Sequence, residues 1–250
     1  MEKSVMKKLI IITGPSGVGK TPLWNAMQKH HPRITKGLHK LTLYTSRKPR
    51  PDEREGVDYF FRNKAFLQRL KRKTEFCVVQ VRNDIHALNV RELLHTLKEK
   101  PVLYEGNPYV SLQLITMKDL RKIKKLSIFI SSLSKKEIQQ LKRLNIDVPV
   151  HEIITDIMQT KLLRRAHQHK ASLNTHDLKN IEQRAKAAFK ELQMAYRCTV
   201  VVPNHDGEDS PHWQDEPYPT GDAQKTLDTV MSLMAGSKPS RAEHWTKNTL

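Results

Sequence analysis

Four short runs of consecutive apolar residues are spread along the chain, and stretches with helical periodicity lie between them. The runs are Leu9–Ile12, "PVLYEG" at 101–106, "LSIFIS" at 126–131 and "CTVVVPN" at 198–204. A strand that is buried on both faces of a parallel sheet has this continuous apolar character. The helical patterns cover 88–98, 135–144 and 178–196, with a last one at 223–234. Because strands alternate with helices, the pattern predicts an α/β fold in which helices flank a parallel sheet.

The segment between Thr42 and Val81 departs from this rhythm. It offers three short strand-like pieces, "LTLYTS", "DYFF" and "FCVVQV", around a proline-rich turn. We therefore expect a small subdomain inserted into the sheet domain. Further along, "HDGEDSPHWQDEPYPTGD" at 205–222 is acidic and rich in proline and glycine, which predicts a long loop. The residues after Gly236 are expected to fray.

The high positive charge and the lack of long apolar stretches indicate which kinds of partner and which compartment to expect. Its 250 residues are enough for one large domain with insertions, and their formal net charge of +18 predicts attraction to anions such as nucleotides, nucleic acid or a membrane surface. No apolar stretch approaches the length that spans a bilayer, and the apolar run near the N-terminus is too short for a signal peptide. We expect a cytoplasmic protein with no membrane partner. Cys77 and Cys198 lie far apart in apolar surroundings, which predicts buried thiols rather than a disulfide or a metal site.

The sequence GPSGVGKT follows the first apolar run and precedes a helical pattern. Its spacing, G-x-x-x-x-G-K-T, is that of a phosphate-binding loop, formed here by Gly14, Pro15, Ser16, Gly17, Val18, Gly19, Lys20 and Thr21. The glycines let successive backbone N–H groups point at phosphate oxygens, and the helix N-terminus adds partial positive charge. We expect Lys20 to reach the β- and γ-phosphates and Thr21 to place its hydroxyl on Mg²⁺. The alternative is a glycine turn that holds no ligand.

A second candidate anion site lies in "YTSRKPRPDEREGVDYFF". Arg47 and Arg50 flank a lysine and a proline, and the stiff turn is able to aim both guanidinium groups at one phosphate, with Tyr59 following in a strand. An arginine-rich turn of this kind is also common as a solvated surface.

Together, the two motifs closely resemble the guanylate kinase family. That family's hallmark is GPSGxGK followed some 30 residues later by a T-x-R-x-P-R-P-x-E-x-x-G-x-D-Y-x-F segment, and this chain supplies Thr45, Arg47, Pro49, Arg50, Pro51, Glu53, Gly56, Asp58, Tyr59 and Phe61. Weaker similarity continues to about residue 205. The resemblance implies a P-loop nucleoside-monophosphate-kinase fold with an acceptor-binding insertion and a mobile helical lid. It also implies transfer of the γ-phosphoryl group of ATP to GMP, with Arg47, Arg50 and Tyr59 on the acceptor's phosphate.

The chain departs from the family where guanine is read. The family's serine four places before the first arginine is Leu43 here, its F-I-E glutamate falls on Val78, and "VRNDIHALN" replaces its glycine, tyrosine and serine motif, leaving Asp84 as the nearby acid. The strand end V-L-D-x-D reads "VLYEGN", so Glu105 is the one carboxylate there and a candidate to orient the Mg²⁺ water shell, or simply a solvent-facing residue. We therefore expect this chain to retain the family's residues for the acceptor's phosphate but not its polar residues for the acceptor's base.

The same resemblance implies candidate residues in the lid and at the site that binds the adenine of ATP. Candidate catalytic arginines are Arg164 and Arg165, which precede a lid-like loop "HQHKASLNTHD", and Arg184, which falls on a family arginine. Asn204 is a candidate adenine contact. The implied domain covers 1–236, with its core at 1–40, 88–145 and 178–236, its acceptor-binding insertion at 41–87, its lid at 146–177 and a flexible tail at 237–250.

The leading hypothesis is an ATP- and Mg²⁺-dependent kinase acting on a small phosphorylated acceptor, GMP by resemblance. A relative that phosphorylates another acceptor, such as a sugar phosphate, is the close alternative, because the base site differs. A non-catalytic guanylate kinase-like binding module is a further alternative, against which the complete Lys20 and Thr21 pair argues. Nucleic acid is not expected as a partner, because no aromatic interleaving or recognised module accompanies the charge. The oligomeric state stays open.

Overall fold

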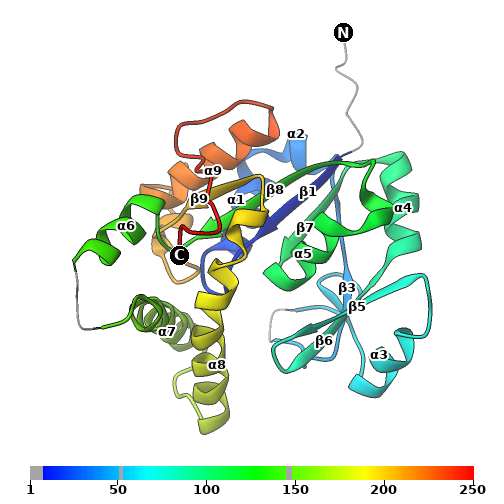
Figure 1. Cartoon of the computed structure of the whole chain (residues 1–250), viewed down its shortest axis with the longest axis horizontal. Coiled ribbons are helices and arrows are strands. Elements are labelled where there is room, and N and C mark those ends of the chain that lie inside the picture. Colours follow the sequence, from blue (N-terminus) through cyan, green and yellow to red (C-terminus); the bar gives the residue numbers. More distant parts are fainter. Residues whose placement is uncertain (1–7, 51–52, 145–147) are drawn as a thin grey trace. The chain divides into compact units, whose positions relative to one another are not determined.

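The computed structural model describes residues 8–50, 53–144 and 148–250 (Figure 1). The chain divides into two compact units: unit 1 comprises Met1–Ile11 and Gly37–Lys125, and unit 2 comprises Ile12–Lys36 and Leu126–Leu250. Strands β1 (Lys8–Thr13) and β8 (Lys124–Ser131) both cross the boundary between the units.

Unit 1 contains strands of two sheets. In the first, β2 (His39–Lys40) pairs in parallel with β7 (Val102–Gly106), and β7 neighbours β1. The second sheet has the strand order β4-β3-β6-β5. Its strands are β3 (Leu43–Thr45), β4 (Tyr59–Phe61), β5 (Phe76–Val81) and β6 (Asp84–Asn89). Strand β3 is parallel to β4 and antiparallel to β6, which in turn is antiparallel to β5.

A two-residue turn sets the register of the β5–β6 hairpin. Its first residue, Arg82, has a φ of +53°, a left-handed conformation that side chains rarely adopt. The Gln80 amide holds the turn by donating hydrogen bonds to the carbonyl oxygens of Arg82 (2.8 Å) and Asp84 (2.9 Å). With this register His86 lies opposite Val79 on one side and Thr45 on the other. Asp84, His86 and Leu88 therefore share one face of the sheet with Thr45.

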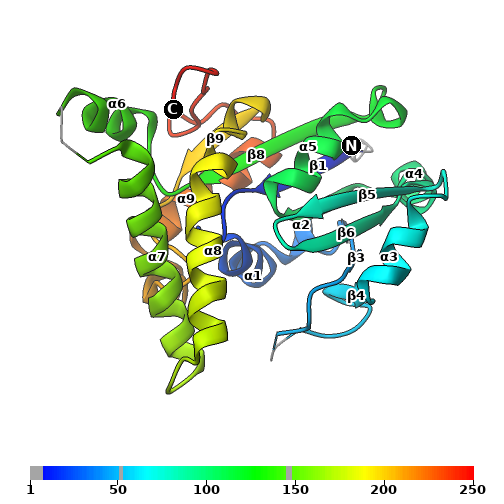
Figure 2. The same ribbon diagram turned by 60° about the horizontal axis from the view of Figure 1, so that its bottom comes forward.

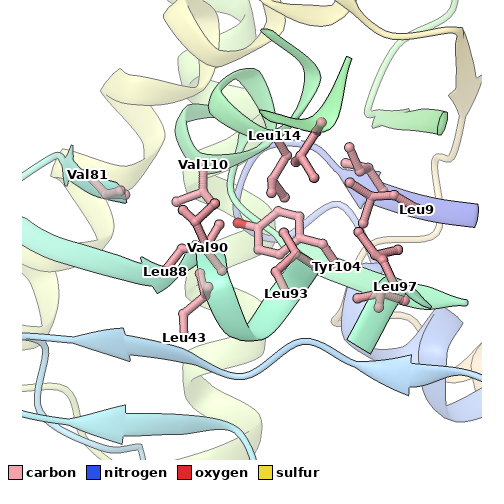
Figure 3. Close-up of a cluster of buried hydrophobic side chains, with 13 residues drawn as sticks. Leu9, Leu43, Val81, Leu88, Val90, Leu93, Leu97, Tyr104, Val110 and Leu114 are labelled. Atoms are coloured by element: carbon pink, nitrogen blue, oxygen red, sulfur yellow. The ribbon is translucent and has the colours of Figure 1, made fainter. Parts of the chain in front are cut away.

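The two faces of this sheet pack into different cores. One face packs on helix α3 (Lys64–Leu70) through Ile85, Ala87 and their neighbours. The other belongs to a larger cluster in which Tyr104 lies among aliphatic side chains, as Figure 3 shows. Helix α4 (Val90–Glu99) contributes Val90, Leu93 and Leu97 to it, the spacing of one helical stripe. Helix α5 (Pro108–Thr116) and the short η1 (Lys118–Leu120) complete unit 1.

Unit 2 places helices around the parallel pair β8 and β9 (Val200–Pro203), in which Ile128 lies opposite Val200. Helices α7 (Val150–His169) and α8 (Thr175–Leu192) lie side by side as a hairpin (Figure 2). The remaining elements are α1 (Lys20–His30), α2 (Pro32–Thr35), α6 (Lys135–Arg143), η2 (Ala195–Arg197), η3 (Pro211–Trp213) and α9 (Gly221–Met234). No helix in the described ranges is long and apolar enough to span a membrane.

Residues 237–250, which we name the C-terminal strap, are packed, so the expectation of a flexible tail is wrong. Glu243 exchanges two backbone hydrogen bonds of 2.8 Å with Val201 of β9. Its carboxylate accepts hydrogen bonds from the Lys135 backbone (2.9 Å) and the Trp245 indole (2.7 Å), and Trp245 is buried. Arg241 donates to the Pro203 carbonyl oxygen (3.0 Å). Apolar burial and paired backbone groups hold the strap, although its composition is polar.

A histidine between two carboxylates lies beside the strap. One ring nitrogen of His205 contacts Asp222 at the start of α9, and the other lies 3.0 Å from Glu137, which belongs to the capping box of α6. Arg241 also contacts Asp222, at 2.8 Å. Burial disfavours protonation of His205, but its hydrogen bonds to Asp222 and Glu137 outweigh burial and raise its pKa above the ordinary histidine value. His205 therefore links α6 and α9 most strongly as a cation.

The structure confirms the predicted α/β class, with a parallel sheet and flanking helices. The four apolar runs form β1, β7, β8 and β9, and the three strand-like pieces of the insertion contain β3, β4 and β5. The expected lid stretch, 146–177, contains the whole of α7 and the start of α8, so His167 and His169 belong to a helix rather than to a loop. Pro51 and residues 1–7 and 145–147, which enter the expected motif and domain boundaries, lie outside the described residues.

Candidate functional site

The glycine loop connects β1 to α1 in unit 2, and its geometry depends on missing side chains. Gly14 has a φ of +147°, and a Cβ added there would lie 2.2 Å from the Ile130 carbonyl oxygen. Gly19 caps the N-terminus of α1 with a φ of +89°, where a Cβ would lie 2.7 Å from the Asn204 amide nitrogen. The curled backbone therefore requires glycine at both ends of the loop. It meets the N-terminus of an 11-residue helix, where backbone N–H groups are available to an anion.

Lys20 is the first residue of α1 and is 7% exposed. Its ammonium group folds back over the loop and donates a hydrogen bond of 2.6 Å to the Pro15 carbonyl oxygen. An ammonium group has three donors, so Lys20 is equipped to bind loop and phosphate oxygens together. The next residue, Thr21, is exposed at the start of the helix.

Asn204 lies where β9 ends and is fully buried. Its amide nitrogen donates to the Val18 carbonyl oxygen (2.8 Å) and to the Asp206 carbonyl oxygen (2.6 Å), and its carbonyl accepts from Thr226 (3.2 Å). Both amide hydrogens are thereby used within the protein. The structure thus uses Asn204 to brace the glycine loop, and its side chain is not presented to a ligand as the sequence suggested.

Helix α7 is tied to the same region through the loop at 204–213. Lys161 donates to the His205 carbonyl oxygen (2.6 Å), Gln168 donates to the Asp209 carbonyl oxygen (2.8 Å), and Arg165 forms an ion pair with Glu208. The Glu208 backbone N–H in turn donates to the Gly17 carbonyl oxygen (3.2 Å). A continuous chain of polar contacts therefore runs from α7 to the glycine loop.

The three candidate lid arginines have different surroundings. Arg165 is paired with Glu208, whereas the adjacent Arg164 is exposed. Arg184 lies half-buried on α8. Arg164 is thus the exposed member of the three, whereas Arg165 would have to give up its ion pair to contact a ligand.

The arginine cluster of unit 1 comprises Arg47, Arg50, Glu53 and Tyr59. Arg47 donates to the Glu53 carboxylate (2.7 Å) and to the Lys48 carbonyl oxygen (2.7 Å). The Arg50 backbone N–H donates to the other Glu53 oxygen (2.8 Å). Burial raises the pKa of Glu53, but the hydrogen bond and charge of Arg47 outweigh it, so its pKa falls below the ordinary glutamate value. Glu53 is thus an anion that orders both arginines.

The Tyr59 ring lies against the Arg47 guanidinium, 5.4 Å from ring centre to the Arg47 Cζ. Burial raises the pKa of its hydroxyl to about 12, and the nearby Glu105 carboxylate adds to the rise. Tyr59 therefore stays protonated and able to donate a hydrogen bond. Glu105 has 12% of its side chain exposed, 3.6 Å from the Lys40 ammonium, so it does not simply face solvent.

The residues expected from the family resemblance to lie near the acceptor's base do not all lie on the sheet face that carries Thr45 and His86. Leu43 is buried in the core on this face, at 2% exposure. Val78 packs on the opposite face, against α3. The neighbouring Val79 therefore lies on the face where Val78 was expected. Asp84 lies on this face and accepts a hydrogen bond from Ser46 (3.1 Å).

Sequence reasoning missed His86, which shares this face. It is 6% exposed, its ring lies edge-on to Tyr59 at 5.7 Å, and its Nδ1 has no hydrogen-bond partner among the described residues. A signal was present, because His86 alternates with apolar residues in "DIHALN", but the register of the hairpin was needed to place it.

Comparisons with known proteins agree with the fold. A family model described as guanylate kinase matches residues 6–159. A guanylate kinase of Synechococcus sp. (strain JA-3-3Ab) is 44% identical over 57 residues, 23% of this chain and 24% of that protein. One of Trichodesmium erythraeum (strain IMS101) is 50% identical over 54 residues, 22% of this chain and 27% of that protein. The matched stretches thus span about a quarter of the length of these relatives.

A crystal structure of guanylate kinase from Anaplasma phagocytophilum has a TM-score of 0.54, covers 96% of this chain and 91% of its own, and is 17% identical in sequence. At that identity the likeness concerns the fold. The family model, in contrast, spans more than half of the 250 residues. The chain therefore belongs to the guanylate kinase family.

Proposed function

We propose that the protein is a kinase that transfers the γ-phosphoryl group of ATP to a small phosphorylated acceptor, for which the family points to GMP. The observation that carries the proposal is the glycine loop, whose backbone is held open at Gly14 and Gly19 and is followed by a buried Lys20 at the start of α1. A loop of this form cradles the phosphates of a nucleoside triphosphate.

The residues of the loop fit ATP with Mg²⁺. Lys20 already folds over the loop, and an ammonium there neutralises charge on the β- and γ-phosphates. The exposed Thr21 hydroxyl is the proposed Mg²⁺ ligand. The metal supplies further positive charge to the transferring group. Asn204 keeps the Val18 carbonyl oxygen in place, so we assign it to positioning the loop.

On the acceptor side, we assign the phosphate to Arg47, Arg50 and Tyr59. Glu53 accepts hydrogen bonds from the Arg47 guanidinium and from the Arg50 backbone N–H, and Tyr59 donates as a neutral phenol. Bidentate guanidinium contacts match phosphate geometry. Asp84 and Glu105 are the carboxylates available to the rest of the acceptor. Among the arginines of the α7–α8 hairpin, we assign Arg164 first to the transferring group, with Arg165 and Arg184 as the other candidates.

One observation favours a different acceptor. Leu43 and Val79 present aliphatic side chains on the face where guanine would need polar partners. A base is discriminated by hydrogen bonds that rival bases do not satisfy. A kinase for another phosphorylated acceptor, such as a sugar phosphate, is therefore the second candidate.

The test is an ADP-release assay with ATP and Mg²⁺ over the four nucleoside monophosphates and a set of sugar phosphates. We expect turnover with at least one phosphorylated acceptor, and GMP to be used less efficiently than by a typical guanylate kinase. Lys20→Ala should abolish turnover while leaving the circular dichroism spectrum unchanged, because Lys20 acts as a charge on phosphates. Absence of turnover with every acceptor would favour a non-catalytic binding module, and Lys20→Ala turnover within tenfold of the parent would contradict the donor site.

A further inference from the structure

His86 is a buried polar side chain whose hydrogen-bonding capacity is only half used. It is 6% exposed in the middle of β6, and its Nδ1 has no partner among the described residues. A buried polar atom without a partner is unfavourable, and native proteins rarely keep one without a reason. The position of His86 in the sheet suggests the reason.

The neighbours of His86 belong to the arginine cluster. Its ring lies edge-on to the Tyr59 ring, with centroids 5.7 Å apart. Burial lowers its pKa most, and the nearby positive charges of Arg47 and Arg82 lower it further. The pKa of His86 falls to about 3, so the imidazole is neutral at physiological pH. The ring therefore lies beside the side chains to which we assigned the acceptor's phosphate.

Hydrogen bonds around Thr45 decide which ring nitrogen carries the proton. The Arg47 backbone N–H donates to the Thr45 hydroxyl oxygen (3.3 Å), and that oxygen lies 3.5 Å from Nε2 of His86. Thr45 is fully buried. If Nε2 carried the proton, the Thr45 hydroxyl would accept twice and its own hydrogen would be left in the core without an acceptor. The satisfied arrangement runs from Arg47 N–H to Thr45 O–H to Nε2, so the hydrogen of the ring is on Nδ1.

We propose that His86 is a ligand-binding residue of the acceptor site, donating a hydrogen bond from Nδ1 to an oxygen of the acceptor's phosphate. The inference rests on the proposed function for the identity of the acceptor. A neutral N–H donor beside two guanidinium groups suits an anionic oxygen, which accepts hydrogen bonds and donates none. It also gives the site a donor that does not change its protonation state across physiological pH.

Nuclear magnetic resonance of the unmodified protein tests the tautomer without any turnover. Long-range ¹H–¹⁵N spectra should show His86 neutral and protonated at Nδ1, and addition of inorganic phosphate or GMP should shift that Nδ1–H signal. Protonation at Nε2, or a signal that neither anion moves, would overturn the assignment. If phosphate and GMP shift the signal while no acceptor supports turnover, the anion site stands and the kinase proposal fails.

Paired variants then test the donor itself. His86→Leu removes the donor, whereas His86→Asn keeps an N–H attached to Cγ, as in the Nδ1 tautomer. We expect His86→Leu to raise KM for the acceptor about 10- to 100-fold with KM for ATP unchanged, and His86→Asn to recover most of that loss. The exposed His95 of α4 offers the matched control, His95→Leu, with no change in either constant.

The acceptor KM separates this role from a purely structural one. His86→Leu also leaves the buried Thr45 hydroxyl without its acceptor, so Tm should fall modestly, whereas a purely structural histidine would not change the acceptor KM of a folded variant. An acceptor KM within twofold of the parent for a folded His86→Leu protein in an active kinase would overturn the proposal while leaving the kinase assignment intact.

Discussion

Asn204 offers the sharpest test of how the glycine loop is held. Its buried amide donates to the carbonyl oxygens of Val18 and Asp206 at 2.8 and 2.6 Å and accepts from Thr226 at 3.2 Å. Asn204→Ala removes all three hydrogen bonds. We expect it to lower the free energy of unfolding of the protein and to raise KM for ATP, because the loop loses its connection to the end of β9.

The structure sets the size of the effect. The Asp206 carbonyl oxygen keeps a hydrogen bond from the Trp213 indole (3.1 Å), and Thr226 has a second acceptor in the Pro203 carbonyl oxygen (3.4 Å). The Val18 carbonyl oxygen loses the donor that Asn204 supplied. One unsatisfied buried carbonyl and one further lost hydrogen bond together amount to about 2–4 kcal/mol.

Asn204→Asp separates lost hydrogen bonds from lost volume. At pH 7 it places a carboxylate, which accepts and does not donate, against two carbonyl oxygens, so it should destabilise at least as much as Asn204→Ala. Burial and those oxygens should raise the pKa of the new carboxyl group, so its penalty applies above that pKa and disappears as pH falls through it. The stability of the Asn204→Asp variant should therefore rise relative to that of Asn204→Ala as the pH is lowered from about 7 to about 4.

Urea unfolding followed by tryptophan fluorescence measures both variants, since Trp213 packs beside Gly19. Asn63→Ala is the matched control, because Asn63 is an exposed helix cap that donates nothing to the loop. It should cost about 0.5–2 kcal/mol without changing KM for ATP. A loss below about 0.5 kcal/mol for Asn204→Ala, or an aspartate variant as stable as the parent at pH 7, would refute the reasoning.

Three further changes have expected outcomes. Arg47→Ala should raise KM for the acceptor about 10- to 150-fold while calorimetric ATP affinity stays constant, and equal losses at both would contradict separate anion sites. His205→Gln should lower the stability of the protein more at pH 6 than at pH 9. A histidine whose pKa is raised by folding stabilises the protein fully below its unfolded pKa of about 6.5, and this stabilisation is lost as pH rises through the folded pKa. A loss of Tm that does not depend on pH would argue against the Asp222 and Glu137 contacts. Gly14→Ala should sharply reduce soluble yield, because its Cβ would lie 2.2 Å from a backbone oxygen, and a well-folded variant would show that the loop relaxes more easily than the structure indicates.

The parts of the fold that the sequence predicts are those set by local pattern. Strands β1, β7, β8 and β9 are continuous apolar runs because both of their faces are buried, so no knowledge of pairing was needed. Helix α7 was expected only through the helical lid that the family resemblance implies, because its buried residues, Ile154, Met158 and Leu162, form a narrow stripe in a polar stretch. The packing of the C-terminal strap depends on a distant strand edge, which the sequence does not reveal.

In the candidate site too, features set by a local motif were predicted from the sequence, and features set by contacts between distant segments were not. The glycine loop is a contiguous motif, and its glycines have the left-handed conformations expected of it. The sheet face on which each β5 side chain lies depends instead on the register set by the left-handed turn at Arg82. The sequence alone therefore did not show which of Val78 and Val79 lies on the face of His86. Asn204 was expected to contact a base because its position after a strand resembles the family, whereas its contacts with Val18 and Asp206 bring together segments far apart in the chain.

The C-terminal strap has a consequence for synthesis of the protein. In the sheet order β9 is a terminal strand, and the Glu243 backbone pairs with Val201 there. An uncovered strand edge is a template for pairing with another molecule. Because the strap follows every other element along the chain, β9 stays open while those elements emerge from the ribosome. Neighbouring nascent chains on one messenger RNA are therefore most exposed to aggregation in that interval, and shortening the chain at Gly236 should make this hazard permanent.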